Sequence, residues 1–413
     1  MKVLVIGGGG RCHAIIDALH KSPLVDKIYA APGNDGMKDL ATLVAIKETN
    51  VDEMLKFAKD NHIDLTVVGP EVALEAGMVD AFRKEGLLIF GPTKGAAQIE
   101  TSKNFAKELM QKYDIPTAAF KTFKKYDDAI SYVKYRGLPI VLKYDGLAAG
   151  KGVVIATTLN EAEEALTDML VNDKFGNASV VIEDYLEGPE FSFMCFVSKE
   201  AVYPMVLSQD HKRAYENDLG PNTGGMGAYS GVPIITDEDV DYALEHIMKK
   251  TAKALCEEGV PFTGVLYGGL MKTKDGVKVI EFNARFGDPE TEIVLPRLKS
   301  DAFKVFCDII NGNNPNLEWS DNYTLGIVLA SKGYPETYEK GYPIFGLEEV
   351  NAKVYHMGTK FDGTNYVTNG GRVLIVVGEG KTLKEAQQNA LKEVVKIKCD
   401  NLFYRRDIGH KSL

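Results

Sequence analysis

The stretch Val279–Thr291 reads VIEFNARFGDPET, a short apolar strand pattern that runs into a turn. Side chains alternate between the two faces of a strand, so Glu281, Asn283 and Arg285 are expected to share one face. Ile280, on the other face, would then belong to the core. Carboxylate and amide oxygens are ligands that Mg²⁺ prefers, and the ion leaves further positions to water and phosphate. A guanidinium beside them suits a phosphoryl group in transfer, so the row predicts a magnesium–ATP site.

The row alone does not decide the function. A lone E-x-N-x-R pattern is more often the polar face of an ordinary surface strand than a metal site. The continuation GDPET favours the functional interpretation, because the turn would bring Asp288 and Glu290 to the same end of the strand. Support must come from the rest of the chain.

The bulk composition is that of a globular protein with several domains. The chain has 413 residues, of which 45% are hydrophobic and 26% charged, so two to four domains are expected. The net charge of −10 argues against a nucleic-acid-binding surface, which needs a basic face. The five cysteines form no CxxC pair, and the N-terminus lacks the pattern of a signal peptide. No apolar run is long enough for a membrane span, so a cytoplasmic protein is expected, binding neither nucleic acid nor membrane.

Strand and helix patterns alternate in the first part of the chain, from KVLVI (2–6) to LLIFG (87–91). This order predicts a parallel, doubly wound α/β domain at residues 1–100. One long helical stretch is expected from Thr93 to Tyr113.

Shorter gaps separate the strand patterns that follow, which predicts α+β parts in a second domain at residues 101–323. Within it, residues of about 120–190 are expected to form a mobile subdomain with an antiparallel sheet and a flexible hairpin. The turn-forming run NGNNPN (311–316) precedes a small α+β C-terminal domain at 324–413.

The segment KYDGLAAGKG (143–152) combines lysines with glycines. Its glycines leave backbone N–H groups free to wrap a phosphate, and Lys143 and Lys151 add positive charge. It is not a P-loop, because Asp145 stands where that motif needs glycine and Gly152 stands where it needs Ser or Thr. An ordinary flexible glycine hairpin remains an equal alternative.

The opening VIGGGGRCH (5–13) is a glycine loop after a strand, but it does not match a dinucleotide fingerprint. Cys12 stands where the third glycine belongs, and the second strand ends without the acid that binds a ribose. A glycine loop at a helix N-terminus still binds phosphate, and Arg11 can add a bidentate contact. The loop therefore predicts a ribose-phosphate site.

Two further segments are rich in polar residues. VVIEDYLEGPEFSF (180–193) is a strand, a turn and a strand, whose edge can give adenine its backbone contacts and whose acids can bind a ribose; ordinary solvated acids are the alternative. SQDHKRAYENDLGPNTGGMGAYS (208–230) joins a dense polar cluster to a glycine-rich loop. His211 is expected to be a hydrogen-bonding loop residue, because no second histidine lies near it. No serine has the G-x-S-x-G context of a nucleophile.

Taken in order, GGGGRCH, GPE (69–71), KYDGLAAGKG, SQDHKR, GPNTGGMGAYS, EFNARFGDPET and VTNGGRVL (367–374) resemble the ATP-grasp superfamily and, within it, the phosphoribosylamine–glycine ligase family. The resemblance covers essentially the whole chain, and its motifs are long and specific. It implies a dinucleotide-like N-terminal domain, a central ATP-grasp region and a small C-terminal domain that build one site. It also implies ATP as co-substrate with Mg²⁺ or Mn²⁺, and glycine and 5-phosphoribosylamine as substrates of a monomer or weak homodimer.

The resemblance assigns roles to individual residues. The metal would be carried by Glu281 and Asn283. ATP would contact Lys103, Lys143, Gly146, Gly150, Lys151, Gly152, Glu183, Tyr185, Leu186 and, at its ribose, Glu190. Phosphoribosylamine would face Gly8, Gly9, Gly10, Arg11 and Glu71. Glycine and the reacting centre would face Asp210, Lys212, Asn222, Gly224, Gly225, Met226, Gly227 and Arg285, with Arg285, Lys143 and Asp210 as catalytic residues.

The implied reaction joins glycine to 5-phosphoribosylamine in de novo purine synthesis. The glycine carboxylate would attack the γ-phosphate of ATP to give glycyl phosphate, and the amine would then displace phosphate. No enzyme nucleophile is required, which agrees with the absence of a nucleophile motif. One departure stands out, because the family usually reads Arg-Glu-His where this chain reads Arg-Cys-His at 11–13. No role is transferred to Cys12.

Three alternatives remain open from the sequence. Another ATP-grasp ligase, such as a carboxylase or a peptide-bond ligase, would share most motifs, but SQDHKR with GPNTGGMG looks specific to the glycine enzymes. A dinucleotide oxidoreductase is opposed by the missing third glycine and ribose acid. A non-catalytic nucleotide sensor is opposed by the intact Glu281 and Asn283.

Overall fold

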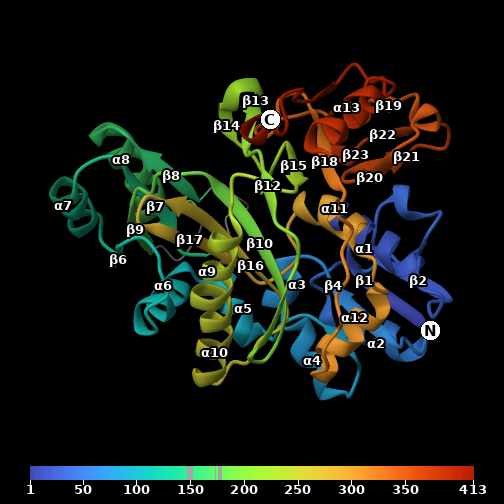
Figure 1. The fold of residues 1–413 in the computed structure, drawn as a ribbon, viewed down its shortest axis with the longest axis horizontal. Coiled ribbons are helices and arrows are strands. Elements are labelled where there is room, and N and C mark those ends of the chain that lie inside the picture. Colours follow the sequence, from blue (N-terminus) through green and yellow to red (C-terminus); the bar gives the residue numbers. More distant parts are fainter. Residues whose placement is uncertain (147–151, 173, 175–178) are drawn as a thin grey trace.

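A parallel sheet between two layers of helices forms the N-terminal part of the molecule (Figure 1). The structure, a computed structural model, describes residues 1–413 apart from 147–151, 173 and 175–178. The five strands lie in the order β3-β2-β1-β4-β5. Their bounds are β1 (Lys2–Gly7), β2 (Lys27–Pro32), β3 (Thr42–Leu43), β4 (Leu65–Val68) and β5 (Ile89–Phe90). The helices between them are α1 (Gly10–His20), α2 (Val51–Asp60), α3 (Glu71–Glu75) and α4 (Met78–Lys84).

The alternation of side chains along β1 explains why both faces of this sheet are covered. Val3 and Val5 pack in one hydrophobic cluster with α1 and with α12 (Ala302–Asn311). Leu4 and Ile6 pack in another cluster with α2, α3 and α4. A strand that is apolar on both faces needs such a cover on each side. The predicted doubly wound α/β arrangement is confirmed.

The helical stretch expected from Thr93 to Tyr113 is two helices rather than one, α5 (Lys94–Thr101) and α6 (Lys103–Lys112). Ser102 breaks it, with φ −128° and ψ 109°. Its hydroxyl caps α6 by accepting the N–H of Phe105 at 3.1 Å. A serine at an N-cap satisfies an otherwise unpaired N–H, which favours the break. Lys103 is thereby placed at the N-terminus of α6.

A four-stranded antiparallel sheet in the order β6-β9-β7-β8 follows. Its elements are β6 (Phe120–Phe123), α7 (Tyr126–Arg136), β7 (Ile140–Tyr144), β8 (Val153–Ala156), α8 (Leu159–Leu166) and β9 (Val180–Asp184). Side chains from its strands and from α7 and α8 form a hydrophobic cluster of their own. Figure 1 shows this unit projecting from the rest of the molecule.

The largest sheet has ten strands, of which eight follow one path in the order β17-β16-β10-β12-β15-β18-β23-β20. The first five on this path are β17 (Gly276–Asn283), β16 (Thr263–Thr273), β10 (Glu190–Ser198), β12 (Ser208–Asp210) and β15 (Gly227–Ser230). The others are β18 (Tyr323–Ser331), β23 (Arg372–Gly380) and β20 (Lys353–His356) on the path, with β11 (Ala201–Pro204) beside β10 and β24 (Leu402–Phe403) beside β18. Because β15 pairs with β18, the C-terminal strands continue the central sheet. No sequence pattern indicated this continuity.

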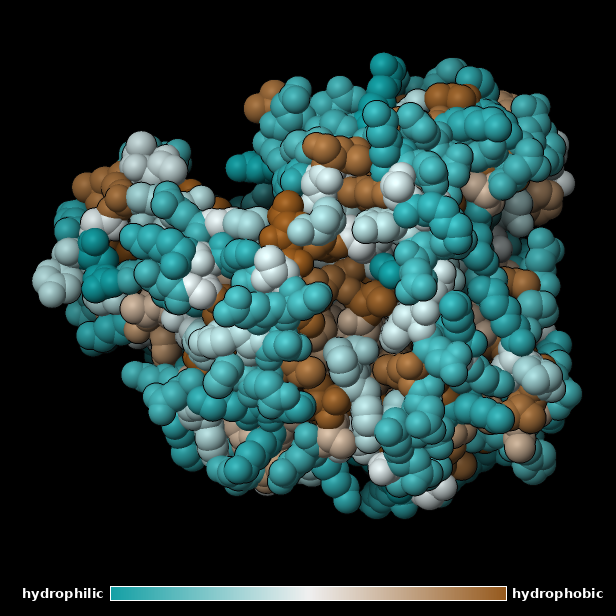
Figure 2. All heavy atoms as spheres, in the orientation of Figure 1, coloured by the Kyte–Doolittle hydropathy of each residue, from teal (hydrophilic) through white to brown (hydrophobic). Residues whose placement is uncertain are grey.

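Helices and small sheets complete the structure. The remaining helices are α9 (Asp237–Ala243), α10 (Lys249–Glu257), α11 (Glu290–Val294) and α13 (Leu383–Val394). The remaining strands are β13 (Arg213–Tyr215) with β14 (Leu219–Asn222), and β19 (Pro343–Ile344) with β22 (Tyr366–Thr368) and β21 (Thr359–Phe361). Within the described residues, no helix has the length and apolar character to cross a bilayer. Figure 2 shows a mostly hydrophilic surface that is hollowed between the unit with α7 and α8 and the C-terminal part.

Candidate active site

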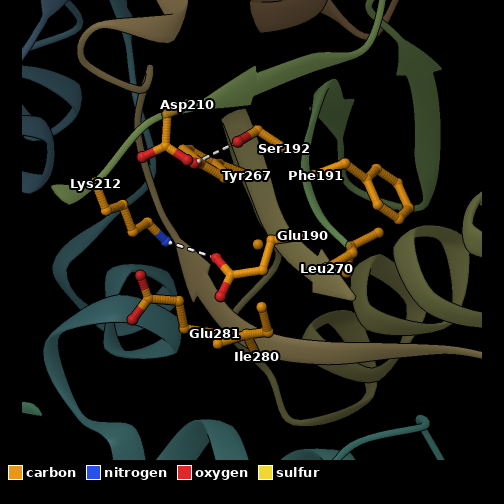
Figure 3. Close-up of a pocket in the computed structure, with 10 residues that line it drawn as sticks. Glu190, Phe191, Ser192, Asp210, Lys212, Tyr267, Leu270, Ile280 and Glu281 are labelled. Carbon is orange, nitrogen blue, oxygen red and sulfur yellow. Dashed lines mark hydrogen bonds and ion pairs between the residues drawn. The ribbon is translucent and has the colours of Figure 1, made fainter. Parts of the chain in front are cut away.

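A polar pocket lies where β10, β12, β16 and β17 run side by side (Figure 3). It is lined by Glu190, Phe191, Ser192, Asp210, Lys212, Tyr267, Gly269, Leu270, Ile280 and Glu281. Figure 3 shows Glu190, Asp210, Lys212 and Glu281 directed toward a common space. The sheet thus brings together ionisable groups from three separate segments of the sequence.

A β-bulge in β17 shapes this wall of the pocket. The register passes from the pair Gly269–Glu281 to the pair Leu270–Val279, so Ile280 is an extra residue. Ile280 lines the pocket instead of the core, and the prediction from strict alternation is wrong at this position. The extra residue of a bulge leaves the ladder, and here its carbonyl accepts a hydrogen bond from Nζ of Lys143 at 2.8 Å.

Glu281 is surrounded by cations. Burial alone would raise the pKa of its carboxyl, but Lys212, Lys143, Lys103 and Arg285 together lower it. The carboxylate is therefore ionised at neutral pH, as a metal ligand must be.

The donor set fits a magnesium ion that is completed by phosphate. In the described part of the chain, no group of three His, Cys, Asp or Glu side chains could hold a metal by itself. Magnesium, however, usually takes only one or two carboxylates from the protein and fills its other positions with water and substrate phosphates. Glu281 and Asn283 offer a carboxylate and an amide oxygen two residues apart on β17.

Glu183 lies buried between two lysines. Lys143 Nζ lies 3.0 Å from its Oε1, and Lys107 Nζ lies 3.1 Å from its Oε2. All three side chains are at most 4% exposed. Burial lowers the pKa of Lys107 to about 8, against the opposing effect of Glu183. The carboxylate of Glu183 is thus engaged by both lysines, and its strand, β9, is paired with β6 on one side and with β7 on the other. The adenine contact expected at this residue stays a prediction.

Lys103 approaches the glycine segment from α6. Its Nζ donates to the carbonyl oxygen of Gly146 at 3.0 Å. Gly146 has φ +139°, a conformation that favours glycine. At the other end of the segment, the carbonyl of Gly152 accepts the N–H of Tyr144 at 2.7 Å. The predicted phosphate ligands Gly150 and Lys151 lie outside the described residues.

Asp210 and Lys212 come from the end of β12. Nζ of Lys212 lies 3.2 Å from Oε2 of Glu190, the residue predicted at the ribose. Burial raises the pKa of Asp210 to about 7, although Lys212 opposes the shift. Tyr185 and Leu186, the other predicted nucleotide contacts, follow β9, and Tyr185 is exposed.

Arg285 belongs to an arginine–carboxylate network with the N-terminal segments. Its Nη2 lies 2.9 Å from Oε1 of Glu100, and its Nε lies 3.2 Å from Oε2 of Glu71. Glu71 also faces Arg11, whose Nη2 is 3.6 Å away. Arg11 in turn donates to the carbonyl of Phe286 at 2.9 Å. The glycine loop of α1, with Gly8, Gly9 and Gly10, is thereby held beside the turn after β17.

Asp288 and Glu290, the two acids of the turn after β17, have different partners. Asp288 pairs with Arg372, whose Nη2 lies 3.1 Å from its Oδ1, and it also accepts the N–H of Arg11 at 3.4 Å. Glu290 is buried and accepts the hydroxyl of Tyr267 at 2.5 Å and that of Ser192 at 3.2 Å. Asp288 thus bonds to the N- and C-terminal parts and Glu290 to the pocket wall, and the expectation that the turn brings both acids to the metal end of the strand stays a prediction.

The loop from Asn222 to Gly227 packs against the C-terminal part. Gly224 donates its N–H to the hydroxyl of Tyr334 at 2.9 Å and accepts from Arg372 at 2.9 Å. Gly225 has φ +120°, and a Cβ there would lie 2.6 Å from Pro289. Met226 is fully buried in the core; its N–H donates to the carbonyl of His211 at 2.8 Å, and its carbonyl accepts the N–H of Val328 at 3.1 Å. Asn222 is exposed at the end of β14.

Comparison with known proteins identifies the family. The phosphoribosylglycinamide synthetase family models match as its N domain at residues 1–100, its ATP-grasp (A) domain at 101–291 and its C domain at 324–411. The chain belongs to this family. A phosphoribosylamine–glycine ligase of Halalkalibacterium halodurans is 56% identical over 417 residues, which cover 100% of this chain and 97% of that protein. One from Listeria innocua is 52% identical over 419 residues, covering both chains completely.

Solved structures agree with this family and with the wider fold. The crystal structure of a phosphoribosylamine–glycine ligase from Thermotoga maritima has a TM-score of 0.87 and 31% identity, and the match covers 99% of this chain and 100% of that one. A biotin carboxylase domain from Hydrogenobacter thermophilus, solved with MgADP and bicarbonate, has a TM-score of 0.72 at 17% identity, over 98% and 91% of the two chains. The second likeness shows the fold alone.

Cys12, which stands where the family usually has glutamate, is a packing residue. It is 1% exposed, and burial raises the pKa of its thiol to about 12. A Cβ added at Gly7 or at Gly69 would lie 2.5 or 2.4 Å from its sulfur. The thiol therefore fills a space that two glycines leave, and it has neither the ionisation nor the exposure of a reactive cysteine.

Several side chains at the site were not predicted from the sequence. They are Glu100, Lys107, Ser192, Tyr267 and Arg372. Ser192 and Arg372 lie within two quoted segments, 180–193 and 367–374, in which no role was assigned to them, and Tyr267 lies in a strand without a motif around it. Glu100 and Lys107 are charged residues on the buried faces of α5 and α6. A charged residue at a helix position that is expected to be buried is the signal by which the sequence could have marked them.

Glu71, which pairs with Arg285 and Arg11, is expected to make the stability of the protein sensitive to acid. Burial alone would raise its pKa, but Arg285 and Arg11 lower it to about 2, from 4.5. A lowered folded-state pKa contributes stability that is present above pH 4.5 and is lost as the pH falls toward 2, up to about 3 kcal/mol. In urea titrations, the free energy of unfolding of Glu71→Gln should therefore fall below that of the parent at pH 7, and the two should converge as the pH falls toward 2. A difference that does not change with pH would contradict the ion pairs.

Proposed function

We propose that this pocket ligates glycine to 5-phosphoribosylamine, with ATP as energy source, to give glycinamide ribonucleotide, ADP and phosphate in purine biosynthesis. The observation that supports it most strongly is the convergence of Glu281, Asp210 and Lys212 in one pocket of a chain that matches the three family models. ATP-grasp enzymes work with ATP and Mg²⁺, and the charges of the pocket suit that pair.

The nucleotide would lie between the four-stranded sheet and β17. Its phosphates would meet Lys103 and Lys143 and the glycine segment from Gly146 to Gly152, which includes Gly150 and Lys151. The adenine would lie against the main chain of Glu183–Leu186, with Glu190 at the ribose. Glu281 and Asn283 would hold Mg²⁺ or Mn²⁺, which when bound offsets the charge of the phosphates.

Glycine would bind beside Asp210, Lys212, Arg285 and the loop 222–227. One oxygen of its carboxylate attacks the γ-phosphorus, the bond to ADP breaks, and glycyl phosphate forms. Lys143 and Arg285 place fixed positive charge near the group in transfer, where it counters the charge that develops. Arg285 is held for this role by Glu71 and Glu100.

Phosphoribosylamine would bind at Gly8–Arg11 and Glu71, with its phosphate at the N-terminus of α1. Its amine attacks the acyl carbon, the carbon–oxygen bond to phosphate breaks, and the nitrogen loses a proton. Asp210 suits the acceptance of that proton, because a carboxyl whose pKa is raised to about 7 is about half ionised near neutral pH and can both take up and release a proton there.

We also propose how the chain is divided. Residues 1–100, 101–323 and 324–413 would act as three domains, with about 120–190 as a lid that excludes water from glycyl phosphate. The separate hydrophobic cluster of the lid and the ranges of the family models support this division. The five free cysteines favour a reducing cytoplasm, and the chain would work as a monomer or weak homodimer.

A reconstituted reaction tests the proposal. Purified protein receives ATP, Mg²⁺, glycine and freshly generated phosphoribosylamine, and ADP release is measured by a coupled assay. Sustained release should require both glycine and the amine. Release that continues without either one would reject the assignment. Bicarbonate in place of glycine should give no release above background, whereas a carboxylase would respond to it.

A further inference from the structure

His211 connects the pocket to the C-terminal end of the chain. It lies between Asp210 and Lys212 in the sequence, and its ring is fully buried. Nε2 accepts the N–H of Gly409 at 2.9 Å. Burial lowers the pKa of the ring to about 4, so it is neutral at physiological pH and able to accept this hydrogen bond. A residue from the far end of the chain thus holds the segment that carries both pocket side chains.

A second connection reaches the other side of the pocket. The hydroxyl of Ser412 lies 2.9 Å from that of Tyr229. Tyr229 donates to the side-chain oxygen of Gln209, and the amide of Gln209 donates to the carbonyl of Glu190. Tyr229 and Gln209 are buried, and the side chain of Glu190 pairs with Lys212 inside the pocket. The path therefore ends at a second wall of the site.

The C-terminal segment is itself firmly anchored. Arg405 is fully buried and makes two hydrogen bonds of 2.8 Å to the carboxylate of Asp407. It also donates to the carbonyl of Arg213 and to Asp218, both at 3.0 Å. A planar guanidinium with several such partners fixes the backbone around it. Arg405 thus holds the segment against the β13–β14 hairpin, which follows Lys212.

We propose that the segment Arg405–Ser412 positions Asp210 and Lys212 for glycine, with His211 as the positioning residue through which it acts. This inference rests on the proposed glycine-binding role of Asp210 and Lys212. The main chain beyond β12 is paired, because His211 bonds through its N–H to Gly227 and through its carbonyl to Met226, and the carbonyl of Lys212 accepts the N–H of Thr223. The ring of His211 adds a side-chain anchor to this segment. Side chains alternate along an extended segment, so fixing the ring of His211 on one face fixes its neighbours on the other.

The test compares two substitutions at position 211. His211→Phe keeps an aromatic ring but removes the acceptor for Gly409, and His211→Gln restores a side-chain oxygen. In His211→Phe the KM for glycine should rise about tenfold or more, because small displacements of positioning groups have effects of that size. The KM for ATP should stay within about twofold, and His211→Gln should recover most of the loss. Near-ultraviolet circular dichroism confirms that each variant is folded.

A second pair of variants tests the same inference if His211→Phe does not fold. Arg405→Met loosens the C-terminal segment, and Arg406→Met is the matched control, because its side chain is exposed and next in sequence. Only Arg405→Met should raise the KM for glycine. Equal rises in the KM for glycine and for ATP would show a general structural effect and would overturn the proposal.

Asp210→Asn, measured in parallel, separates this inference from the proposed function. If Asp210→Asn leaves the KM for glycine unchanged, the glycine site is misassigned and both proposals fall. If Asp210→Asn raises that KM and folded His211→Phe does not, only the positioning role is rejected.

Discussion

Glu281→Ala is expected to lower kcat by about a thousandfold or more while the protein stays folded. Lys103, Lys143, Lys212 and Arg285 surround this carboxylate, and together they lower its pKa. Its removal would take away the proposed metal ligand and leave those cations without this counter-charge where the phosphates are proposed to bind. The kcat for ADP release, measured at saturating ATP and Mg²⁺, checks the prediction.

A matched control separates this effect from a change of net charge. Asp275→Ala removes a carboxylate from the turn between β16 and β17, on the same hairpin but away from the pocket. It should leave kcat within about twofold, as is usual for surface substitutions. If Glu281→Ala were also to keep more than a tenth of the parent kcat, the assignment of Glu281 to the metal would be wrong. Isothermal titration calorimetry with Mg²⁺ in the presence of ADP measures metal binding independently of turnover. The affinity for Mg²⁺ should fall only in Glu281→Ala.

Lys143→Met should both destabilise the protein and impair its use of ATP. The ammonium group is buried against Glu183 and donates to the carbonyl of Ile280. Removing one partner of a buried ion pair typically costs about 3–5 kcal/mol, and because Lys107 still pairs with Glu183 we expect a loss at the lower end of that range. If Lys143 also contacts a phosphate of ATP, its loss should in addition raise the KM for ATP and lower kcat by about a hundredfold.

Lys107→Met is the control that separates these two effects. Lys107 pairs with the same carboxylate at nearly the same distance and is equally buried, but it donates to Thr117 instead of the bulge at Ile280. Both variants should therefore lose stability in urea titrations to a similar degree. Only Lys143→Met should show the additional kinetic loss at temperatures where both are folded. If the two variants have the same kcat and the same KM for ATP, Lys143 acts only as a structural partner of Glu183.

Much of the fold could be predicted from local pattern. The alternating strands and helices of the N-terminal part specify a parallel sheet, because a strand that is apolar on both faces must be covered on both. The antiparallel unit with β6 to β9 also followed from the spacing of its strands. The pairing of β15 with β18 did not, since edge-to-edge pairing between distant segments leaves no periodic signal in either one.

The functional site, like the fold, could be predicted from the sequence only in part. The long motifs specify the family, and the family models and full-length relatives confirm it. The individual roles of the site residues stay predictions, and the structure adds the constraints that they must satisfy. Asp288 shows the limit of spacing alone, because its partner Arg372 comes from a strand far away in the sequence.

By itself, the sequence determined that a strand with Glu281, Asn283 and Arg285 belongs to an ATP-grasp ligase, since side-chain chemistry and motif order are local properties. Only the tertiary structure decided that Ile280 leaves the core and that its carbonyl binds Lys143, because a bulge depends on the register with β16. Only the tertiary structure decided that Gly409 holds His211 beside the pocket. Both depend on which distant segments meet, and that is fixed by the packing of the whole chain.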